Sequence, residues 1–269
     1  MRDAFPSRMP RRISSLALLA LIAGVIASAL PAAAQASLSL TPAVIMAKGT
    51  YGQSLTQRLT INNQSSNVFH FEMLAEDIVV RDGKRVFLPA GEVENSIAAT
   101  AVFSPKEIIA PPNTSASVEV TVTIPANTKV RAIAAIFHAT SGVNPATGSV
   151  GLVASMGTLL TFNLSSNVSI ESEPVHVVLP TETTNLIFTQ DLTNTGTEPV
   201  VPKGVVAILG DQGRLVGKAA FETQRLLPAE KLTYHAQYAD SLKPGGYHAM
   251  CTFEYEGKTE TKQIDFTVQ

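Results

Sequence analysis

The sequence predicts an all-β protein made of two tandem β-sandwiches that follow a cleaved signal peptide. Residues 191–200 read as a strand end, an Asn/Gly turn and a second strand, and residues 58–68 are a looser copy of that pattern far upstream. Asn and Gly tolerate positive φ and Pro199 has no amide hydrogen to donate, so each stretch predicts a chain reversal between two extended runs. A Pro-bounded strand follows each turn, at 108–125 and at 226–244. This repetition predicts two similar domains.

Residues 1–36 predict the signal peptide. Four arginines precede an apolar run at 13–30, and the small residues of Ala34-Gln35-Ala36 fit a cleavage site. We therefore expect a mature chain that begins at Ser37 and lies in the periplasm, or is secreted to the cell surface. A retained membrane anchor is the alternative, because 18 apolar residues are just enough to span a bilayer.

The charge balance and the cysteine content limit the possible partners. Without the leader the chain has 16 Lys and Arg against 21 Asp and Glu, so its net charge is 16 − 21 = −5. That balance argues against nucleic acid and against an anionic membrane as the principal partner. The one cysteine, Cys251, allows no internal disulfide, although an exported protein could form one. No apolar tail follows the last predicted strand at 263–269, so we expect no membrane insertion after signal cleavage.

The first domain is expected to span residues 37–170. Its opening strand is interrupted at Pro42, and extended runs flank the first turn. Residues 78–88 are two apolar runs around Asp82-Gly83. This is a strong hairpin signal, because a type I′ turn needs positive φ at both central residues.

Three further segments complete the first domain. Residues 117–124 alternate apolar and polar side chains, which predicts a strand with one buried face. The nearly continuous apolar run 130–139 predicts a central strand covered on both faces. A loop at 140–149 then precedes 151–164, the long strand expected to close the domain.

A charged segment without apolar periodicity, 171–174, separates two apolar runs, so we place the second domain at 171–269. Residues 205–216 predict a hairpin about Gly-Asp-Gln-Gly, and further strands are expected at 231–238 and 262–268. No run of ten or more residues keeps a 3.6-residue apolar period with caps. Little helix is therefore expected.

The strand that begins at Tyr247 predicts an immunoglobulin-like sandwich. A Tyr that opens a strand just after a Pro-Gly turn can bond its hydroxyl back to the turn, as in the tyrosine corner of immunoglobulin-like domains. Strand alternation places Tyr247, Cys251 and Phe253 on one face, which we expect to lie in the core. Cys251 is therefore predicted to be buried and unreactive.

With these features in place, the mature chain resembles the periplasmic chaperones of pilus and fimbria assembly, which are exported proteins with two immunoglobulin-like domains. The resemblance lies in the Thr41-Pro42 opening, in the strand-turn-strand at 59–68, and in the run from Phe103-Ser104-Pro105 to Pro125. It implies a protein client and no enzymatic activity.

The chain departs from that family at the residues that anchor the client. In the family, a basic residue after the opening Thr and another on the closing strand hold the client's carboxyl terminus. Here Pro42 and Ala43 take the first place, and 151–164 contains no Lys or Arg. We therefore expect that a client is not anchored in the usual way.

More distantly, the chain resembles the two-domain Gram-positive surface proteins that accompany WxL-domain proteins. This likeness lies in Gly49-Thr50-Tyr51 and in residues 242–247. The membrane helix and basic tail of that family are not found after residue 247.

The sequence predicts no catalytic set, no cofactor and no metal site. Acidic pairs such as Glu76-Asp77 lie in predicted polar connections, where they read as solvated. Metal-ligand spacing is absent among the five histidines, which fall in separate predicted strands: His70, His138, His176, His235 and His248. An unrecognised hydrolase is a remote alternative.

We therefore expect a non-enzymatic protein-binding protein, a chaperone-like component of a pilus or surface-structure assembly system. The expected binding element is strand 151–164, whose backbone would add to an incoming strand while Leu160, Phe162 and Leu164 offer it an apolar row. An ordinary final strand that packs this row into its own sandwich also explains the alternation. The alternative function is a structural or adhesive surface protein that binds glycan or cell-wall-associated partners.

Overall fold

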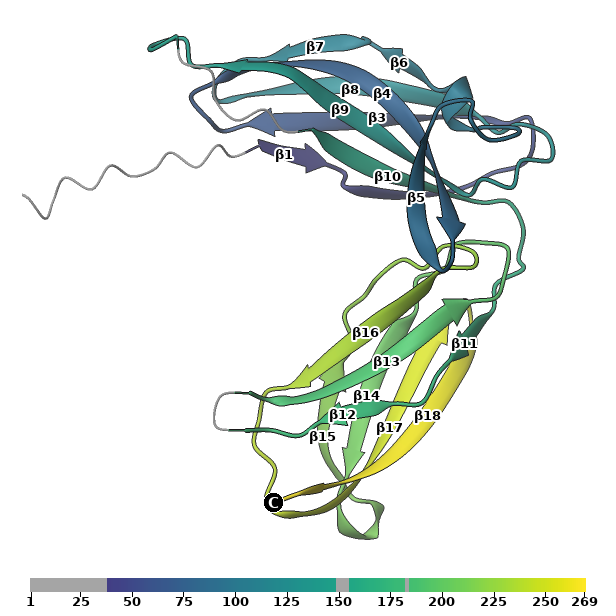
Figure 1. The fold of residues 1–269 in the computed structure, drawn as a ribbon, viewed down its shortest axis with the longest axis vertical. Coiled ribbons are helices and arrows are strands. Elements are labelled where there is room, and N and C mark those ends of the chain that lie inside the picture. The colour runs from purple at the N-terminus through teal and green to yellow at the C-terminus, as the bar shows by residue number, and fades with distance from the viewer. Residues whose placement is uncertain (1–37, 149–154, 182–183) are drawn as a thin grey trace, which may run out of the picture. The chain divides into compact units, whose positions relative to one another are not determined.

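The computed structural model describes residues 38–148, 155–181 and 184–269, and residues 37–269 form one compact unit. The described strands form four sheets, two in each of two β-sandwiches (Figure 1). This confirms the all-β, two-sandwich prediction. The predicted signal peptide lies outside the described residues. Within the described ranges, no helix is long and apolar enough to cross a bilayer.

The first sandwich contains strands β1 to β10. One sheet has the order β1 (Leu38–Thr41), β3 (Ser54–Asn63), β8 (Thr114–Thr123) and β6 (Val102–Ser104). The other has the order β2 (Val44–Lys48), β10 (Met156–Asn163), β9 (Ala132–Val143), β4 (Val68–Arg81) and β5 (Lys84–Pro89), and β7 (Glu107–Ala110) also pairs with β4. β1 and β2 belong to different sheets, so the interruption predicted at Pro42 is the point where the opening strand changes sheet.

The second sandwich contains strands β11 to β18. In one sheet β13 (Leu186–Asn194) pairs with β11 (Ile170–Ser172), β12 (His176–Val178) and β16 (Lys231–Tyr238). The other sheet has the order β15 (Leu215–Ala220), β14 (Lys203–Leu209), β17 (Gly245–Tyr255) and β18 (Lys258–Val268). The helical turns in the described ranges are two short 3-10 segments, η1 (Ala98–Thr100) and η2 (Asp211–Gly213).

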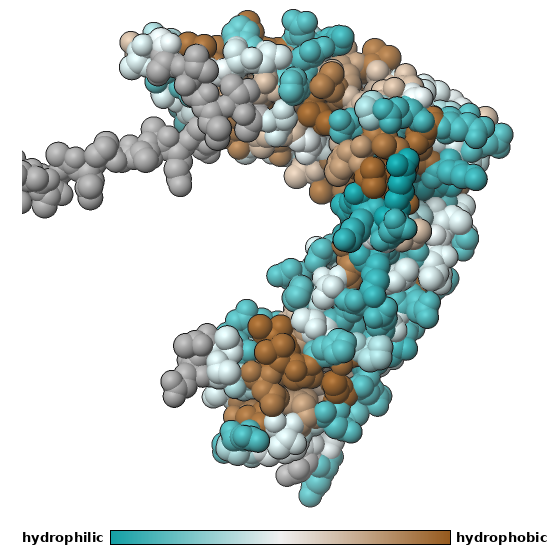
Figure 2. All heavy atoms as spheres, viewed as in Figure 1, coloured by the Kyte–Doolittle hydropathy of each residue, from teal (hydrophilic) through white to brown (hydrophobic). Residues whose placement is uncertain are grey.

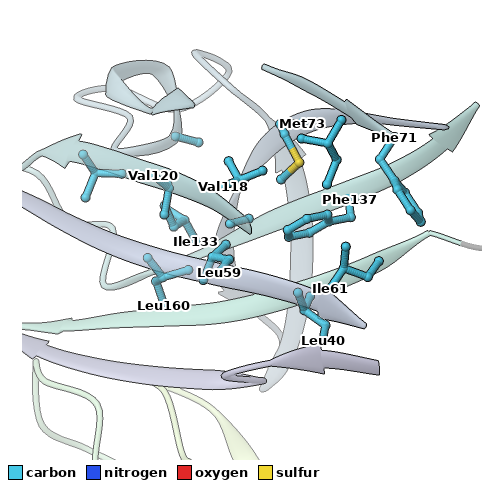
Figure 3. Close-up of a cluster of buried hydrophobic side chains, with 14 of the residues drawn as sticks. Leu40, Leu59, Ile61, Phe71, Met73, Val118, Val120, Ile133, Phe137 and Leu160 are labelled. Atoms are coloured by element: carbon cyan, nitrogen blue, oxygen red, sulfur yellow. The ribbon is translucent and has the colours of Figure 1, made fainter. Parts of the chain in front are cut away.

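The core of the first sandwich lies between its two sheets (Figure 3). The predicted alternation of 117–124 is confirmed, because Val118, Val120, Val122 and Ile124 are at most 1% exposed. β9 pairs with β4 on one side and β10 on the other, which confirms the central strand predicted at 130–139.

The hairpin predicted at 78–88 is also confirmed. Its strands are β4 and β5, and Arg81 pairs with Lys84 across the turn. Both turn residues are left-handed, with φ of 51° at Asp82 and 75° at Gly83. These angles are what a type I′ turn requires, and they explain why Asp-Gly is a strong hairpin signal.

β4 is longer than the sequence predicts, because it runs unbroken through the Glu76-Asp77 pair. Asp77 is fully buried, where it accepts hydrogen bonds from the Ser96 hydroxyl and the Ala98 amide. The expectation of a solvated carboxylate at Asp77 is therefore wrong. Two protein donors take the place of water, which is how a buried polar group is normally satisfied.

A buried Asn side chain closes the turn of the first sandwich. Asn63 is 1% exposed, and its Oδ1 accepts the Ser65 amide hydrogen at 3.0 Å. Its Nδ2 donates to the carbonyl oxygens of Asn67, Ala110 and Pro111 at 2.7, 2.9 and 3.0 Å. One amide thus ties the end of β3 to the segment that leads into β8.

Asn194 plays the same part in the second sandwich. It is fully buried, accepts the Gly196 amide hydrogen at 2.9 Å, and donates to the Glu198 and Leu226 carbonyls at 2.9 and 3.1 Å. Each turn is therefore joined to the Pro-bounded segment that follows it in sequence. The internal repetition predicted from these turns is present in the structure.

The two turns reverse the chain by hydrogen bonding, and not through the positive φ angles that the sequence suggested. None of Asn63, Asn194 and Gly196 has a positive φ. Gly196 is needed for a different reason: a Cβ there would lie 2.7 Å from both the Asn167 carbonyl oxygen and the Ser169 amide nitrogen. Glycine allows this close approach of two backbone segments.

The predicted tyrosine corner is present. The Tyr247 hydroxyl donates to the Lys243 carbonyl at 2.7 Å. Along β17, Ala249, Cys251 and Phe253 are fully buried in the second core, as the alternation predicts.

Buried carboxylates of the second sandwich bind arginines of the first. Glu198 is fully buried and accepts hydrogen bonds from Arg131 Nε at 3.2 Å, the Leu164 amide at 2.8 Å and the Ser165 hydroxyl at 2.9 Å. With the Thr197 hydroxyl at 3.4 Å as a fourth donor, this carboxylate is well satisfied away from water. Removing either member of the pair would leave the other charge buried without its partner.

A second pair lies at the tip of the β4–β5 hairpin. Glu230 is 2% exposed, and it accepts Arg85 Nε at 2.6 Å, Arg85 Nη2 at 3.1 Å and the Leu227 amide at 2.7 Å. The Lys231 amide donates to the Gly83 carbonyl at 3.0 Å. The hairpin is therefore fixed to residues 227–231 through both side chain and backbone.

Candidate partner-binding edge and groove

β10 is paired along only part of its second side. β9 pairs with it from Met156 to Thr161, whereas β2 pairs in parallel with Leu159 to Asn163 alone. The Leu159 amide donates to the Ala43 carbonyl at 3.0 Å, which marks the place where β2 joins β10. No strand in the described ranges pairs with Met156, Gly157 or Thr158 on that side. Thr158 is nevertheless fully buried, and its hydroxyl donates to the Pro42 carbonyl at 2.8 Å, so the segment before β2 borders the end of this stretch. We call these three residues the free edge.

Gly157 presents the backbone hydrogen-bonding groups of the free edge. Alternate residues of a strand direct their N–H and C=O groups to the same side. The Leu159 amide faces β2, whereas the Phe162 amide faces the other way and donates to the Arg131 carbonyl at 2.9 Å. Gly157 lies two residues before Leu159, so its N–H and C=O groups point to the same side as those of Leu159, away from β9. Unpaired groups of this kind are the template for an added strand.

The row of side chains predicted to meet the partner is not exposed. Leu160 and Phe162 are each 1% exposed and belong to the core of the first sandwich, where Figure 3 draws Leu160. Leu164 is partly buried against the same core. The expectation of an exposed apolar row is therefore wrong. Alternation shows that one face is buried, but it does not show whether that face meets the chain's own second sheet or a partner.

The opposite face of this sheet, which we call the outer face, carries exposed apolar side chains on its edge strands β5 and β2. Cross-strand register aligns Phe87 of β5 with Ile78 of β4, and Val44 of β2 with Leu159 of β10. Phe87 is 53% and Val44 is 49% exposed. Brown spheres mark hydrophobic residues beside the β4–β5 hairpin in Figure 2. Between these two residues part of the face is covered, because Ile78 is 3% exposed and packs in a buried cluster with Leu227. The exposed apolar side chains on either side are the surface that a partner could contact.

A groove of 390 Å³ lies on the outer face beside the free edge. Met156, Gly157 and Thr158 form one wall, so backbone and side-chain contacts are available to the same incoming strand. Glu76 and Arg85 supply the charged groups of the lining. The remainder is mainly apolar, and includes Ile78, Phe87, Ala134, Ile136 and Leu159.

Two arginines lie near the end of this surface. Arg85 Nη2 donates to the Arg225 carbonyl at 2.6 Å, in addition to its bonds with Glu230. Arg225 Nη1 donates to the Thr161 hydroxyl at 2.8 Å and to the Ile45 carbonyl at 3.1 Å. Burial, and secondly the positive charge of Arg85, lower the pKa of the Arg225 guanidinium. Arg225 thus reaches from the second sandwich to the β2–β10 pair of the first.

Sequence reasoning missed both arginines. The positions that the resemblance points to, beside Pro42 and along 151–164, contain no Lys or Arg. Arg225 is remote in sequence and precedes Leu-Leu-Pro in an irregular segment. Nothing local marks it as a neighbour of β10, because only the tertiary fold brings it there.

Two features of the described residues bear on catalysis, the placement of possible metal ligands and the burial of Cys251. No group of three or more His, Cys, Asp or Glu side chains there is placed to hold a metal ion. Burial raises the pKa of the Cys251 thiol to about 12, so the thiolate needed of a nucleophile is scarce at neutral pH. Backbone pairing and apolar contact are what the free edge and groove offer.

No protein-family model matches the sequence, and no curated protein matches it. Solved structures do match. The fold resembles that of pilus-assembly chaperones. The class 5 fimbriae chaperone CfaA is 13% identical with a TM-score of 0.44, over 87% of this chain and 99% of CfaA.

Two further matches are of the same kind. A chain of the CsuC–CsuE chaperone–tip adhesion subunit complex from Acinetobacter baumannii is 9% identical with a TM-score of 0.42, over 87% of this chain and 100% of that one. A chain of the SafA pilin–SafB chaperone complex from Salmonella enterica is 12% identical with a TM-score of 0.41, over 86% of this chain and 96% of that one. At such identities the likeness is one of fold alone.

Proposed function

We propose that this chain is an exported, non-enzymatic protein that binds a protein partner by adding a strand of the partner to the free edge of β10. The observation that supports this most is the position of the unpaired edge next to an apolar groove. Backbone bonds to Gly157 would hold the incoming strand, and its apolar side chains would fill the groove. This division between main-chain affinity and side-chain specificity is typical of β-augmentation.

The proposed binding strand is the one expected from the sequence, 151–164, but its backbone takes the binding role that was expected of its side chains as well. Its backbone binds the partner, while Leu160, Phe162 and Leu164 pack the strand onto its own sandwich. Residues 151–154 lie outside the described residues, so the proposed site consists of the free edge and the groove.

We further propose that the protein works in the periplasm as a chaperone-like component of pilus or surface-structure assembly. Export rests on the leader-like residues 1–36, and the assembly role rests on the resemblance carried by Thr41-Pro42, 59–68 and 103–125. Solved structures of similar fold include chaperones bound to a pilin and to a tip adhesion subunit. A partner that is a surface subunit would fit this role, whereas a glycan would fit the adhesive alternative.

Two substitutions at Gly157 test strand addition. Gly157→Pro removes the one amide hydrogen at the middle of the free edge, and an edge strand tolerates proline where that hydrogen faces solvent. Gly157→Ala is the matched control: its Cβ would lie 3.6 Å from the Ala135 carbonyl oxygen and from Ile136 Cγ1, which is ordinary contact, and it keeps the amide. Each variant is tagged, expressed in the periplasm and used to capture partners, and its thermal stability is measured.

We expect both variants to fold. Gly157→Ala should retain the partner that the unmodified chain captures, and Gly157→Pro should lose it. If Gly157→Pro retains the partner, strand addition at this edge is refuted. If both folded variants lose the partner, the loss cannot be assigned to the missing amide hydrogen, because Gly157→Ala keeps it. The proposal then fails in that form.

A further inference from the structure

β2 covers the rest of the edge to which a partner strand would add. Its residues pair with Leu159 to Asn163, directly beyond the free edge. Val44 and Met46 are 49% and 45% exposed, and Ile45 and Ala47 are only partly buried against the core. A parallel edge strand of 5 residues that buries so little surface gains little from packing. Something besides the core must keep it in place.

Arg225 is placed to do so. Its Nη1 donates both to the Ile45 carbonyl of β2, at 3.1 Å, and to the Thr161 hydroxyl of β10, at 2.8 Å. The Thr161 hydroxyl donates in turn to the same Ile45 carbonyl at 3.1 Å. One guanidinium of the second sandwich therefore joins the two strands of the first. Hydrogen bonds from a charged donor are stronger than those between neutral groups.

Arg225 is itself positioned by a residue of the groove. Arg85 lines the groove, donates to the Arg225 carbonyl and pairs with the buried Glu230. Arg225 Nε is buried and has no partner among the described residues, which is costly for a guanidinium nitrogen. The contacts with β2 and β10 are made through Nη1 instead.

We propose that Arg225 is a latch that holds β2 on β10 and so sets how far a partner strand can extend. With the latch closed, pairing is confined to the free edge. When the latch opens, β2 leaves and the added strand continues along β10 as far as Asn163. A partner in the groove contacts Arg85, and through it the segment that carries the latch. The proposal rests on strand addition for its purpose, but the latch acts within the free chain and is tested there without a partner.

Amide hydrogen exchange in Arg225→Ala and Thr161→Val tests the latch. Two backbone bonds report on β2: the Leu159 amide to the Ala43 carbonyl, and the Gly49 amide to the Asn163 carbonyl at 3.1 Å. Both amides should exchange at least about tenfold faster in Arg225→Ala, as expected for the loss of a hydrogen bond from a charged group. Thr161→Val should act in the same direction, and it replaces no residue of the second sandwich.

Arg214→Ala, at an exposed arginine of the second sandwich, is the control and should change neither amide. The Val120 amide of β8, in the other sheet, should stay unchanged in all variants. Unaltered exchange at Leu159 and Gly49 in Arg225→Ala overturns the latch, and so does an equal acceleration at Val120. If the latch amides respond while Gly157→Pro keeps its partner, the latch on β2 stands and strand addition is the part that fails.

Discussion

Replacing Asn63 by Ala should destabilise the first sandwich through its turn. The side chain is 1% exposed, so water cannot take over its hydrogen bonds. The Ala110 carbonyl and the Ser65 amide would be left buried without their partner. The Asn67 and Pro111 carbonyls, at partly buried sites, would lose their donor too. A buried group left without a partner costs about 1–3 kcal/mol, and each bond lost at a partly buried site costs about 0.5–1.5 kcal/mol. At the lower limits of these costs, the expected total is at least about 3 kcal/mol.

For a folded unit of this size, about 3 kcal/mol corresponds to a fall in Tm of roughly 6–12 °C. The chain has no Trp, so unfolding is best followed by far-ultraviolet circular dichroism in urea and on heating. Asn62→Ala is the matched control, because that neighbouring amide bonds with Ser39 and Ser115 at exposed sites. It should cost less than about 1 kcal/mol. Equal, small effects of Asn62→Ala and Asn63→Ala would refute the argument that a buried amide closes this turn.

Four further predictions concern other parts of the chain. Glu198→Ala should cost about 3–5 kcal/mol, because a largely buried arginine loses its partner; a change below about 1 kcal/mol in urea unfolding would contradict this. Native Cys251 should react with thiol reagents only after unfolding, because burial raises its pKa to about 12; rapid labelling at neutral pH would disprove the burial. Tyr247→Phe should cost about 0.5–1 kcal/mol by removing the corner bond, and unchanged stability would mean that the ring is held by packing alone. Phe162→Glu should unfold the first sandwich while Phe87→Glu folds normally, since the two rings are 1% and 53% exposed; a folded Phe162→Glu variant would remove that residue from the core.

The features that sequence reasoning predicted correctly are local ones. Asp82-Gly83 forms its hairpin because positive φ at two successive residues is a property of the turn itself. The alternation of 117–124 gives the right buried face, and the burial of Cys251 follows from the same two-residue period. The Tyr247 corner follows from the Pro-Gly turn just before it. In each case the signal and the structure it specifies lie within about ten residues.

The features that sequence reasoning missed depend on contacts between distant segments. Alternation marks Leu160 and Phe162 as one face, but the sheet opposite them is built from residues far away in the chain. The sequence predicts a solvent-exposed carboxylate at Asp77, because the groups that bind it in the core, Ser96 and Ala98, lie beyond an intervening hairpin. Arg225 has no local pattern at all, and its contact with β2 spans 180 residues of sequence.

The most direct test of strand addition is the exchange rate of the Gly157 amide in the purified complex with the captured partner. In the free chain this amide faces away from β9 and has no strand beside it among the described residues, so it should exchange rapidly. In the complex it should become protected, because it donates to the backbone of the added strand. A stable complex in which the Gly157 amide still exchanges as fast as in the free chain would contradict the account.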